Sequence, residues 1–208
     1  MAFTHDELAT MDSIIARYPR KRSAIMPLLH YVQSLAGYVT PEGIEEISKK
    51  IDVETAEVTA VSTFYTQYRT SEPGEYHVGV CINTLCAVMG GDEIFDSVSK
   101  HLGIGNDEVT SDGKVSLERI ECNAACDYAP VVMVNWEFFD NQTPDSVNKL
   151  VDQAREGNPP APTRGPKSLR TWKQNSAVLA GLNDGLASEG VSAGEASLRG
   201  LNASKEGK

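Results

Sequence analysis

The stretch YHVGVCINTLC, residues 76–86, contains the pattern that decides the fold of this chain. Its first half is rich in β-branched and aromatic residues, which predicts a strand over residues 76–80. Cys81 and Cys86 follow at once, in a loop that starts where the strand ends. A strand that leads directly into a pair of cysteines is typical of a site built on a sheet edge.

The same arrangement recurs further along the chain. Residues 115–120 predict a second strand, and Cys122 and Cys126 follow it. Residues 91–102 lie between the two strands and have apolar side chains at helical spacing, which predicts a connecting helix. Two loops at the same edge of one sheet can converge, so we expect the four cysteines to form one site.

The rest of this region completes a mixed domain. Residues 131–134 and 136–139 predict a hairpin that turns near Asn135, and residues 143–155 predict a last helix. The resulting order, β-α-β-β-β-α with a long first connection, is typical of a thioredoxin-like domain with a right-handed crossover. The predicted fold class is therefore α+β.

The chain before Pro73-Gly74 contains sequence patterns typical of helix N-termini. Thr4 to Glu7 has the form of a capping box, and Thr40-Pro41 supplies an N-cap followed by a proline at the first helical position. We predict three segments: a helical domain at residues 1–72, the thioredoxin-like domain at 73–157, and a tail at 158–208. The tail is rich in Pro, Gly, Ser and Ala, and we expect it to be extended or partly disordered.

Composition excludes several classes of protein. The 208 residues have a net charge of −10, which disfavours binding to nucleic acid or to an anionic membrane. Residues 1–157 hold 12 Lys/Arg and 25 Asp/Glu, whereas the tail holds 7 and 4 and is a candidate docking arm. We find no apolar run long enough to span a membrane and no signal-peptide pattern, so we expect a cytosolic bacterial protein. In a reducing compartment its cysteines favour ligands or redox thiols over disulfides.

Four thiolates in one place repel each other unless a cationic group lies between them. Soft sulfur ligands select zinc or an iron-sulfur cluster. The C-x4-C and C-x3-C spacings are loose for one zinc ion and suit the two irons of a [2Fe-2S] cluster. None of the four histidines stands in a C-x-H pair, so an all-cysteine site is favoured over a Rieske type. Two alternatives are a zinc-binding interaction module and a thiol oxidoreductase, which would favour C-x-x-C and leave one pair unexplained.

At these residues the chain resembles the thioredoxin-like [2Fe-2S] ferredoxin family, in particular the E subunits of bacterial respiratory complex I, counterparts of the mitochondrial 24 kDa subunit. The likeness covers residues 20–156 and rests on four stretches, SAIMPLLH (23–30), VSTFYT (61–66), VCINTLC (80–86) and ECNAACDYAP (121–130). The family commonly has Pro where Leu85 stands and Leu-Gly where Asn123-Ala124 stand. These departures concern the surroundings of the sulfurs and leave the ligands in place.

The resemblance implies one [2Fe-2S] cluster, with Cys81 and Cys86 on one iron and Cys122 and Cys126 on the other. It implies docking on a partner subunit that binds FMN and NADH, within a complex on the cytoplasmic side of the bacterial inner membrane. The chain itself has no G-x-G-x-x-G after a predicted strand, in agreement with dinucleotide binding by the partner. Related modules also serve NAD-linked hydrogenases and formate dehydrogenases, and these residues do not separate the three settings.

Overall fold

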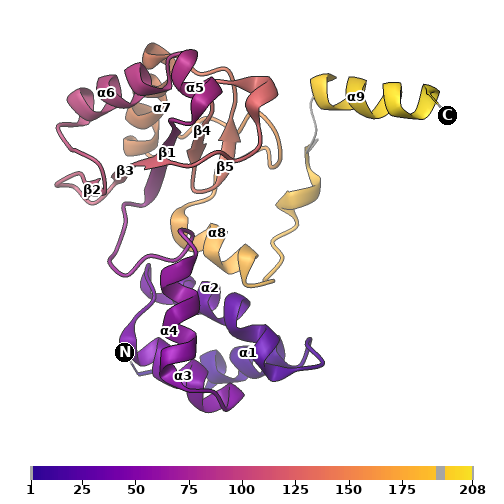
Figure 1. The fold of residues 1–208 in the computed structure, drawn as a ribbon. Coiled ribbons are helices and arrows are strands. Elements are labelled where there is room, and N and C mark those ends of the chain that lie inside the picture. Colours follow the sequence, from indigo (N-terminus) through magenta and orange to yellow (C-terminus); the bar gives the residue numbers. More distant parts are fainter. Residues whose placement is uncertain (1, 191–194, 208) are drawn as a thin grey trace. The chain divides into compact units, whose positions relative to one another are not determined.

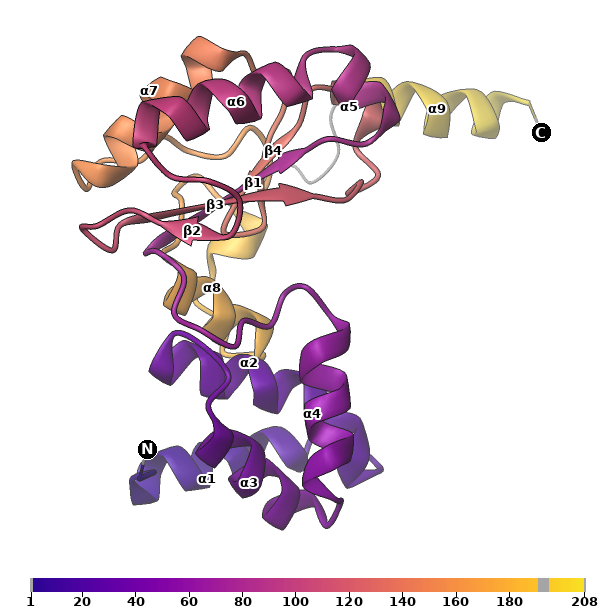
Figure 2. The same ribbon diagram turned by 60° about the vertical axis from the view of Figure 1, so that its left-hand side comes forward.

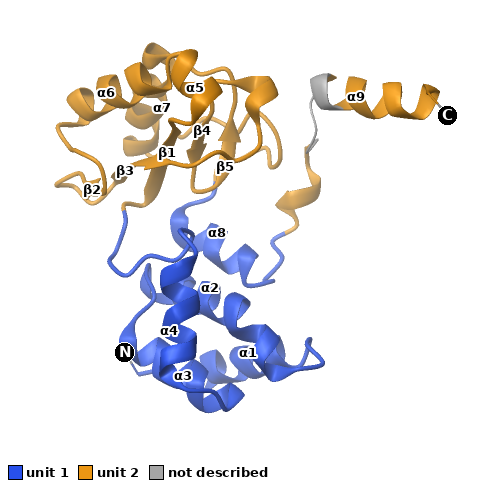
Figure 3. Cartoon of the chain, in the orientation of Figure 1, with its two compact units in different colours: residues 1–73, 170–184 blue, residues 74–169, 185–208 orange. Residues whose placement is uncertain are grey.

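The computed structural model describes residues 2–190 and 195–207 and divides into two compact units. Unit 1 comprises Met1–Pro73 with Arg170–Asp184, and unit 2 comprises Gly74–Leu169 with Gly185–Lys208. Figure 3 shows the two units in different colours. Each unit has its own hydrophobic core, so each is described by itself.

Unit 1 is helical. Its elements are α1 (His5–Ile15), the 3-10 helix η1 (Lys21–Ala24), α2 (Ile25–Ala36), α3 (Pro41–Ile51), α4 (Thr55–Phe64) and α8 (Trp172–Leu179). The predicted caps are present, because the Thr4 and Thr40 hydroxyls accept hydrogen bonds from the amides of Glu7 and Gly43. The α2 helix ends at Gly37, which has a φ of 93° and therefore a conformation that glycine adopts without strain.

The tail differs from the extended or partly disordered segment that composition predicts. Residues 170–184 are packed into unit 1, where α8 lies against α2. Trp172 is 3% exposed and donates its indole N–H to the Gly37 carbonyl at 2.7 Å. Arg170 forms a two-bond ion pair with Asp184, at 2.7 and 2.9 Å. From the sequence, Trp172 and the basic residues around it suggest an anchor for a partner, whereas in the structure Trp172 and Arg170 bond within the chain. A few large side chains can order a segment that is otherwise poor in apolar surface.

The remainder of the tail also contains helical segments. The structure has η3 at Leu186–Ser188 and α9 at Glu195–Glu206, whereas residues 158–171 have no regular secondary structure. The part of the predicted arm at residues 191–194 and 208 lies outside the described residues. Among the residues that are described, none of the helices has the length and apolar character needed to cross a membrane.

Unit 2 is built on a five-stranded mixed sheet with the order β2-β3-β1-β4-β5. The strands are β1 (Tyr76–Cys81), β2 (Glu108–Val109), β3 (Val115–Ile120), β4 (Val132–Val134) and β5 (Glu137–Phe139). The helices are α5 (Thr84–Val88), α6 (Gly91–Leu102), the 3-10 helix η2 (Cys126–Tyr128) and α7 (Pro144–Arg155). The sequence analysis predicts the two long strands, the hairpin and both long helices, and it misses α5 and β2, which are too short to show periodicity.

The two long helices of unit 2 cover one face of its sheet. Figure 1 shows α6 and α7 beside the strands, and Figure 2, which is turned by 60°, shows both helices on the same side of the sheet. Tyr76, Val78 and Val80 of β1 face these helices and belong to the main core. Because side chains alternate along a strand, Cys81 belongs to a separate cluster with residues of the second cysteine pair's loop, such as Ala125 and Ala129.

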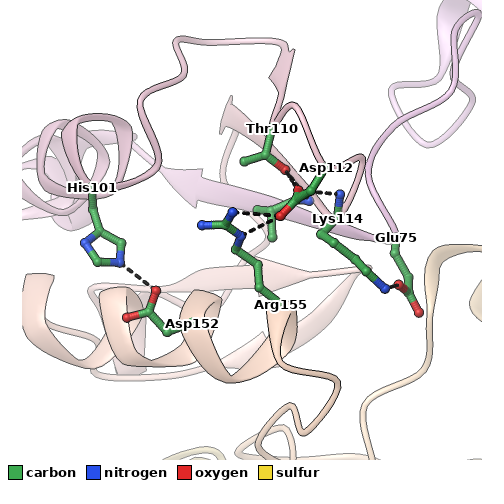
Figure 4. Close-up of polar contacts among 8 residues, drawn as sticks. Glu75, His101, Thr110, Asp112, Lys114, Asp152 and Arg155 are labelled. Atoms are coloured by element: carbon green, nitrogen blue, oxygen red, sulfur yellow. Dashed lines mark hydrogen bonds and ion pairs between the residues drawn. The ribbon is translucent and has the colours of Figure 1, made fainter.

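A polar network fixes the end of the sheet that lies away from the cysteines. The Asp112 carboxylate accepts hydrogen bonds from the Thr110 hydroxyl and, at 2.9 and 2.7 Å, from the Arg155 guanidinium at the end of α7. Lys114 pairs with Glu75 at 2.6 Å, next to the first residue of β1 (Figure 4). The Thr110 and Arg155 hydrogen bonds lower the pKa of Asp112 to about 2. The network ties the β2–β3 turn to α7 and leaves the opposite end of β1 and β3 for the cysteine loops.

Candidate metal centre

The four cysteines lie in two loops at one edge of the sheet. β1 and β3 are parallel neighbours, and their register pairs Cys81 with Ile120. The first cysteine loop, residues 81–91, therefore starts beside the second cysteine loop, residues 121–130. This is the convergence that the two strand-cysteine patterns predict.

All four thiols line a single cavity of about 300 Å³, together with Asn83, Thr84, Leu85 and Val88. Cys81 and Cys86 are buried, at 2% and 3% exposure, whereas Cys122 and Cys126 are exposed. The sulfurs of Cys122 and Cys126 are 3.6 Å apart. The structure thus brings together every cysteine that the sequence singles out, as free thiols.

The backbone of the first cysteine loop is shaped by close packing. Cys81 is the last residue of β1 and Cys86 lies within α5. A Cβ atom on Gly91 would stand 2.5 Å from the Cys81 carbonyl oxygen and 2.9 Å from that of Cys86. Gly91 is therefore needed for space, whereas Gly90, with a φ of 108°, is needed for its backbone conformation.

The second cysteine loop is irregular and is held by individual contacts. Ala124 has a φ of 55°, and its amide donates to the Cys122 sulfur at 3.3 Å. The Ala129–Pro130 peptide bond is cis. The Arg164 guanidinium from the tail segment lies 5.2 Å from the Tyr128 ring centroid and pairs with Asp140.

The surroundings of Cys81 and Cys126 disfavour their thiolates when no cation is present. Burial raises the pKa of the Cys81 thiol to about 11, although the backbone amide of Asn83 favours the thiolate in part. The hydrogen bond with Cys122 raises the pKa of Cys126. A thiol oxidoreductase needs a thiol whose pKa is lowered, so these shifts weigh against that alternative. They suit a site whose ligands lose their protons to a metal.

The arrangement of the four thiols bears on whether the site holds a single ion or a larger group. Within residues 2–190 and 195–207, no three His, Cys, Asp or Glu side chains converge closely enough to hold a single metal ion. The four thiols instead surround a cavity as two pairs, one buried and one exposed. A cluster of two irons bridged by sulfide takes two thiolates on each iron, and the residues present fit that group better than a single tetrahedral zinc.

A comparison with family models agrees with this chemistry. The model of the thioredoxin-like [2Fe-2S] ferredoxin matches residues 11–155. The chain belongs to the thioredoxin-like [2Fe-2S] ferredoxin family. The cofactor of a thioredoxin-like [2Fe-2S] ferredoxin is the [2Fe-2S] cluster, in agreement with the cofactor that the resemblance implies.

One relative covers nearly the whole chain, and another covers two thirds of it. The E subunit of the NADH-quinone oxidoreductase of Mycobacterium tuberculosis is 54% identical over 99% of this chain and 83% of its own length. NADH-quinone oxidoreductase subunit 2 of Thermus thermophilus is 40% identical over 67% of this chain and 78% of its own length. The mycobacterial alignment includes the tail, which the family model leaves out.

A solved structure shares the fold of this ferredoxin. A chain of an NAD+-reducing [NiFe]-hydrogenase superposes with a TM-score of 0.56 at 16% identity, over 64% of the present chain. The ferredoxin spans only 23% of that hydrogenase chain. At this identity the likeness concerns the fold alone.

Sequence reasoning did not single out Asn83, the steric role of Gly91, or Arg164 as a contact of the second cysteine loop. In the sequence Asn83 belongs to an ordinary loop between the first two cysteines, and Arg164 is distant in sequence from Tyr128. The adjacent glycines Gly90 and Gly91 are visible in the sequence, where they suggest unusual backbone conformations. At Gly91 the structure shows close packing instead.

Proposed function

We propose that the chain is the iron-sulfur electron-transfer subunit of the NADH-oxidising module of a proton-translocating NADH-quinone oxidoreductase, respiratory complex I. The observation that carries this function is the set of four free thiols around one cavity at the ends of two parallel strands. The names of the relatives, which include the E subunit of NADH-quinone oxidoreductase at 54% identity, support the assignment of that site to this machine.

In this proposal Cys81 and Cys86 hold one iron of the cluster, and Cys122 and Cys126 hold the other. When bound, the cluster supplies one-electron transfer. The protein supplies four thiolates and buries one pair while it leaves the other pair at the surface. An exposed pair lets a partner's redox group approach closely, whereas the buried pair excludes water from one side of the site.

The partner is a subunit that binds FMN and NADH, and single electrons are exchanged with that flavin. The chain acts as one component of an oxidoreductase and contributes no complete active site of its own. It is a peripheral part of a membrane complex on the cytoplasmic side of the bacterial inner membrane. The tail contributes to contacts with further peripheral subunits.

Nearby carboxylates act on the potential of this site. Glu121 and Asp127 flank the second cysteine pair, and both are exposed. A negative charge nearby opposes the addition of an electron, although solvent screens exposed charges. Glu121→Gln combined with Asp127→Asn is expected to raise the midpoint potential in a redox titration. An unchanged potential would show that these charges have no part in setting it.

The composition of the native complex tests the proposed machine. A tagged copy of the chain, expressed from its own locus and purified in mild detergent, is expected to bring down a flavin subunit and membrane-embedded quinone-reducing subunits. Recovery of a nickel hydrogenase subunit would instead assign the chain to an NAD-linked hydrogenase. A chain of such an enzyme shares the fold. A molybdenum subunit would move it to a formate dehydrogenase.

A further inference from the structure

Asn83 joins the two cysteine loops through its side chain. Its Oδ1 atom accepts a hydrogen bond from the backbone amide of Cys122 at 2.7 Å. Its Nδ2 group donates to the Glu121 carboxylate, also at 2.7 Å. A residue between the first pair of cysteines therefore holds the backbone at the start of the second pair.

The Asn83 side chain does not make the hydrogen bond that is usual at its position. Asn83 is the N-cap of α5, where an asparagine usually accepts a hydrogen bond from an amide of its own helix. Here the side chain makes no capping bond. It reaches instead across to the neighbouring loop, and the first turn of α5 does without the cap.

The connection lies where the sheet no longer holds the loops together. The paired register of β1 and β3 ends at Cys81 and Ile120. Cys122 comes two residues after that pair, is exposed, and lies in an irregular segment with a positive φ at Ala124. Asn83 thus continues the link between the two chain segments beyond the last strand pair.

We propose that Asn83 is a positioning residue that fixes Cys122 relative to the buried pair Cys81 and Cys86 and so preorganises the four thiols for the cluster. This inference rests on the proposed function of the site. It gives a specific task to a residue that contacts the backbone of one cysteine and is not itself one of the four thiols. A link of this kind lowers the cost of bringing the second loop into place when the cluster binds.

The test compares two asparagines next to cysteines in the full-length chain. Asn83→Ala removes both bonds between the loops. Asn123→Ala is the matched control, because Asn123 is also half-buried and its amide donates within its own loop, to the Glu121 carbonyl at 3.0 Å. The first readout is the rate at which a chelator removes iron from the reconstituted protein, and the second is the exchange rate of the Cys122 amide in the metal-free protein.

Asn83→Ala is expected to speed iron loss about tenfold, the usual effect of removing an outer partner of a metal site. The Cys122 amide is expected to exchange about tenfold faster as well, because it loses its acceptor. Asn123→Ala is expected to leave both rates within about twofold of the parent. Equal behaviour of the two alanine variants would overturn the inference.

A reciprocal exchange of groups tests positioning against a general loss of stability. In the double variant Asn83→Asp, Glu121→Gln, the aspartate can still accept from the Cys122 amide, and the glutamine can donate to the aspartate. The formal charge is unchanged, and the two side chains keep their bond with donor and acceptor reversed. This variant is expected to recover the parent rate of iron loss and the parent electron paramagnetic resonance spectrum, whereas Asn83→Asp alone sets two carboxylates against each other and is expected to lose iron faster.

Failure of this inference differs from failure of the proposed function. If the parent chain binds no cluster on reconstitution, the proposed function fails. If the parent binds a cluster and the double variant loses iron as fast as Asn83→Ala, the function stands and the positioning role is wrong.

Discussion

The two cysteine loops hold their thiols by different means. In the first cysteine loop, Cys81 ends a strand and Cys86 lies within a helix, so regular structure buries both thiols. In the second, Cys122 and Cys126 are exposed, and individual contacts from Asn83 and Arg164 hold the segment. The first pair of cysteines is therefore held by a strand and a helix, and the second pair depends on a few side-chain contacts.

The largest expected contrast is in thiol reactivity of the metal-free protein. A thiol with a pKa of about 11 is a thiolate in only about one molecule in a thousand at pH 8, and Cys81 is also buried. Because they are exposed, Cys122 and Cys126 are expected to be alkylated at least about a hundredfold faster than the buried Cys81 and Cys86, with Cys126 the slower of the exposed pair because its pKa is also raised. Peptide mass spectrometry over time measures this, with the urea-unfolded chain as control. Similar rates at all four cysteines would break the comparison.

The second contrast concerns close packing under the first cysteine loop. Gly91→Ala drives a methyl group against the Cys81 and Cys86 carbonyls and is expected to lower the free energy of unfolding by about 3 kcal/mol. Gly90→Ala is the control, since its Cβ would make only an ordinary contact with the Glu93 side chain at 3.8 Å and has mainly its backbone strain to overcome, about 1 kcal/mol. Urea unfolding followed by the fluorescence of Trp136, in unit 2, measures both when parent and variants carry Trp172→Phe, because the chain has two tryptophans. If the two variants are equally stable, the loop is not held by this packing.

The third contrast concerns the acid sensitivity of unit 1, which depends on a buried histidine away from the cysteine loops. His30 is 5% exposed and packs against Tyr68, with ring centroids 4.7 Å apart. Burial lowers the pKa of His30 from 6.5 to about 4. The unfolded chain therefore takes up a proton first as the pH falls, so stability is full above pH 6.5 and decreases below it. The loss at pH 5 is expected to be about 2 kcal/mol.

The variant His30→Gln is expected to remove that part of the pH dependence, whatever its effect on stability at pH 8. Fluorescence of Trp172, which is buried in unit 1, reports the unfolding when parent and variant carry Trp136→Phe. An unchanged slope between pH 8 and pH 5 in the variant would show that His30 is not responsible.

The smallest contrast concerns the second cysteine loop. Arg164 lies 4.0 Å from the Phe138 ring centroid, above the ring, and reaches the Tyr128 ring as well. Arg164→Lys keeps the charge near Asp140 and loses the flat guanidinium, at a cost of about 1 kcal/mol. This corresponds to iron loss about fivefold faster. Arg119→Lys is the matched control, because Arg119 lies over Phe95 and pairs with Asp96, and its side chain does not line the cavity of the cysteines. Faster iron loss in both variants would assign the effect to general stability.

The sequence predicts the convergence of the four cysteines well and the contacts around them poorly, for a physical reason. The cysteines follow strands whose apolar alternation is clear, so both their position and their convergence can be inferred. Asn83, Gly91 and Arg164 act through contacts with residues from other segments, and no local pattern encodes such contacts. Trp172 shows the same limit, since the residues around it suggest an extended arm and the Gly37 carbonyl that anchors it is distant in sequence.

The central claim is that the two loops together hold one [2Fe-2S] cluster. Anaerobic reconstitution of the purified full-length chain, followed by analysis of iron and acid-labile sulfide, tests it most directly. The account predicts two irons and two sulfides per chain, with a red-brown colour that bleaches on reduction. A colourless protein, or one zinc ion per chain with no sulfide, would contradict it.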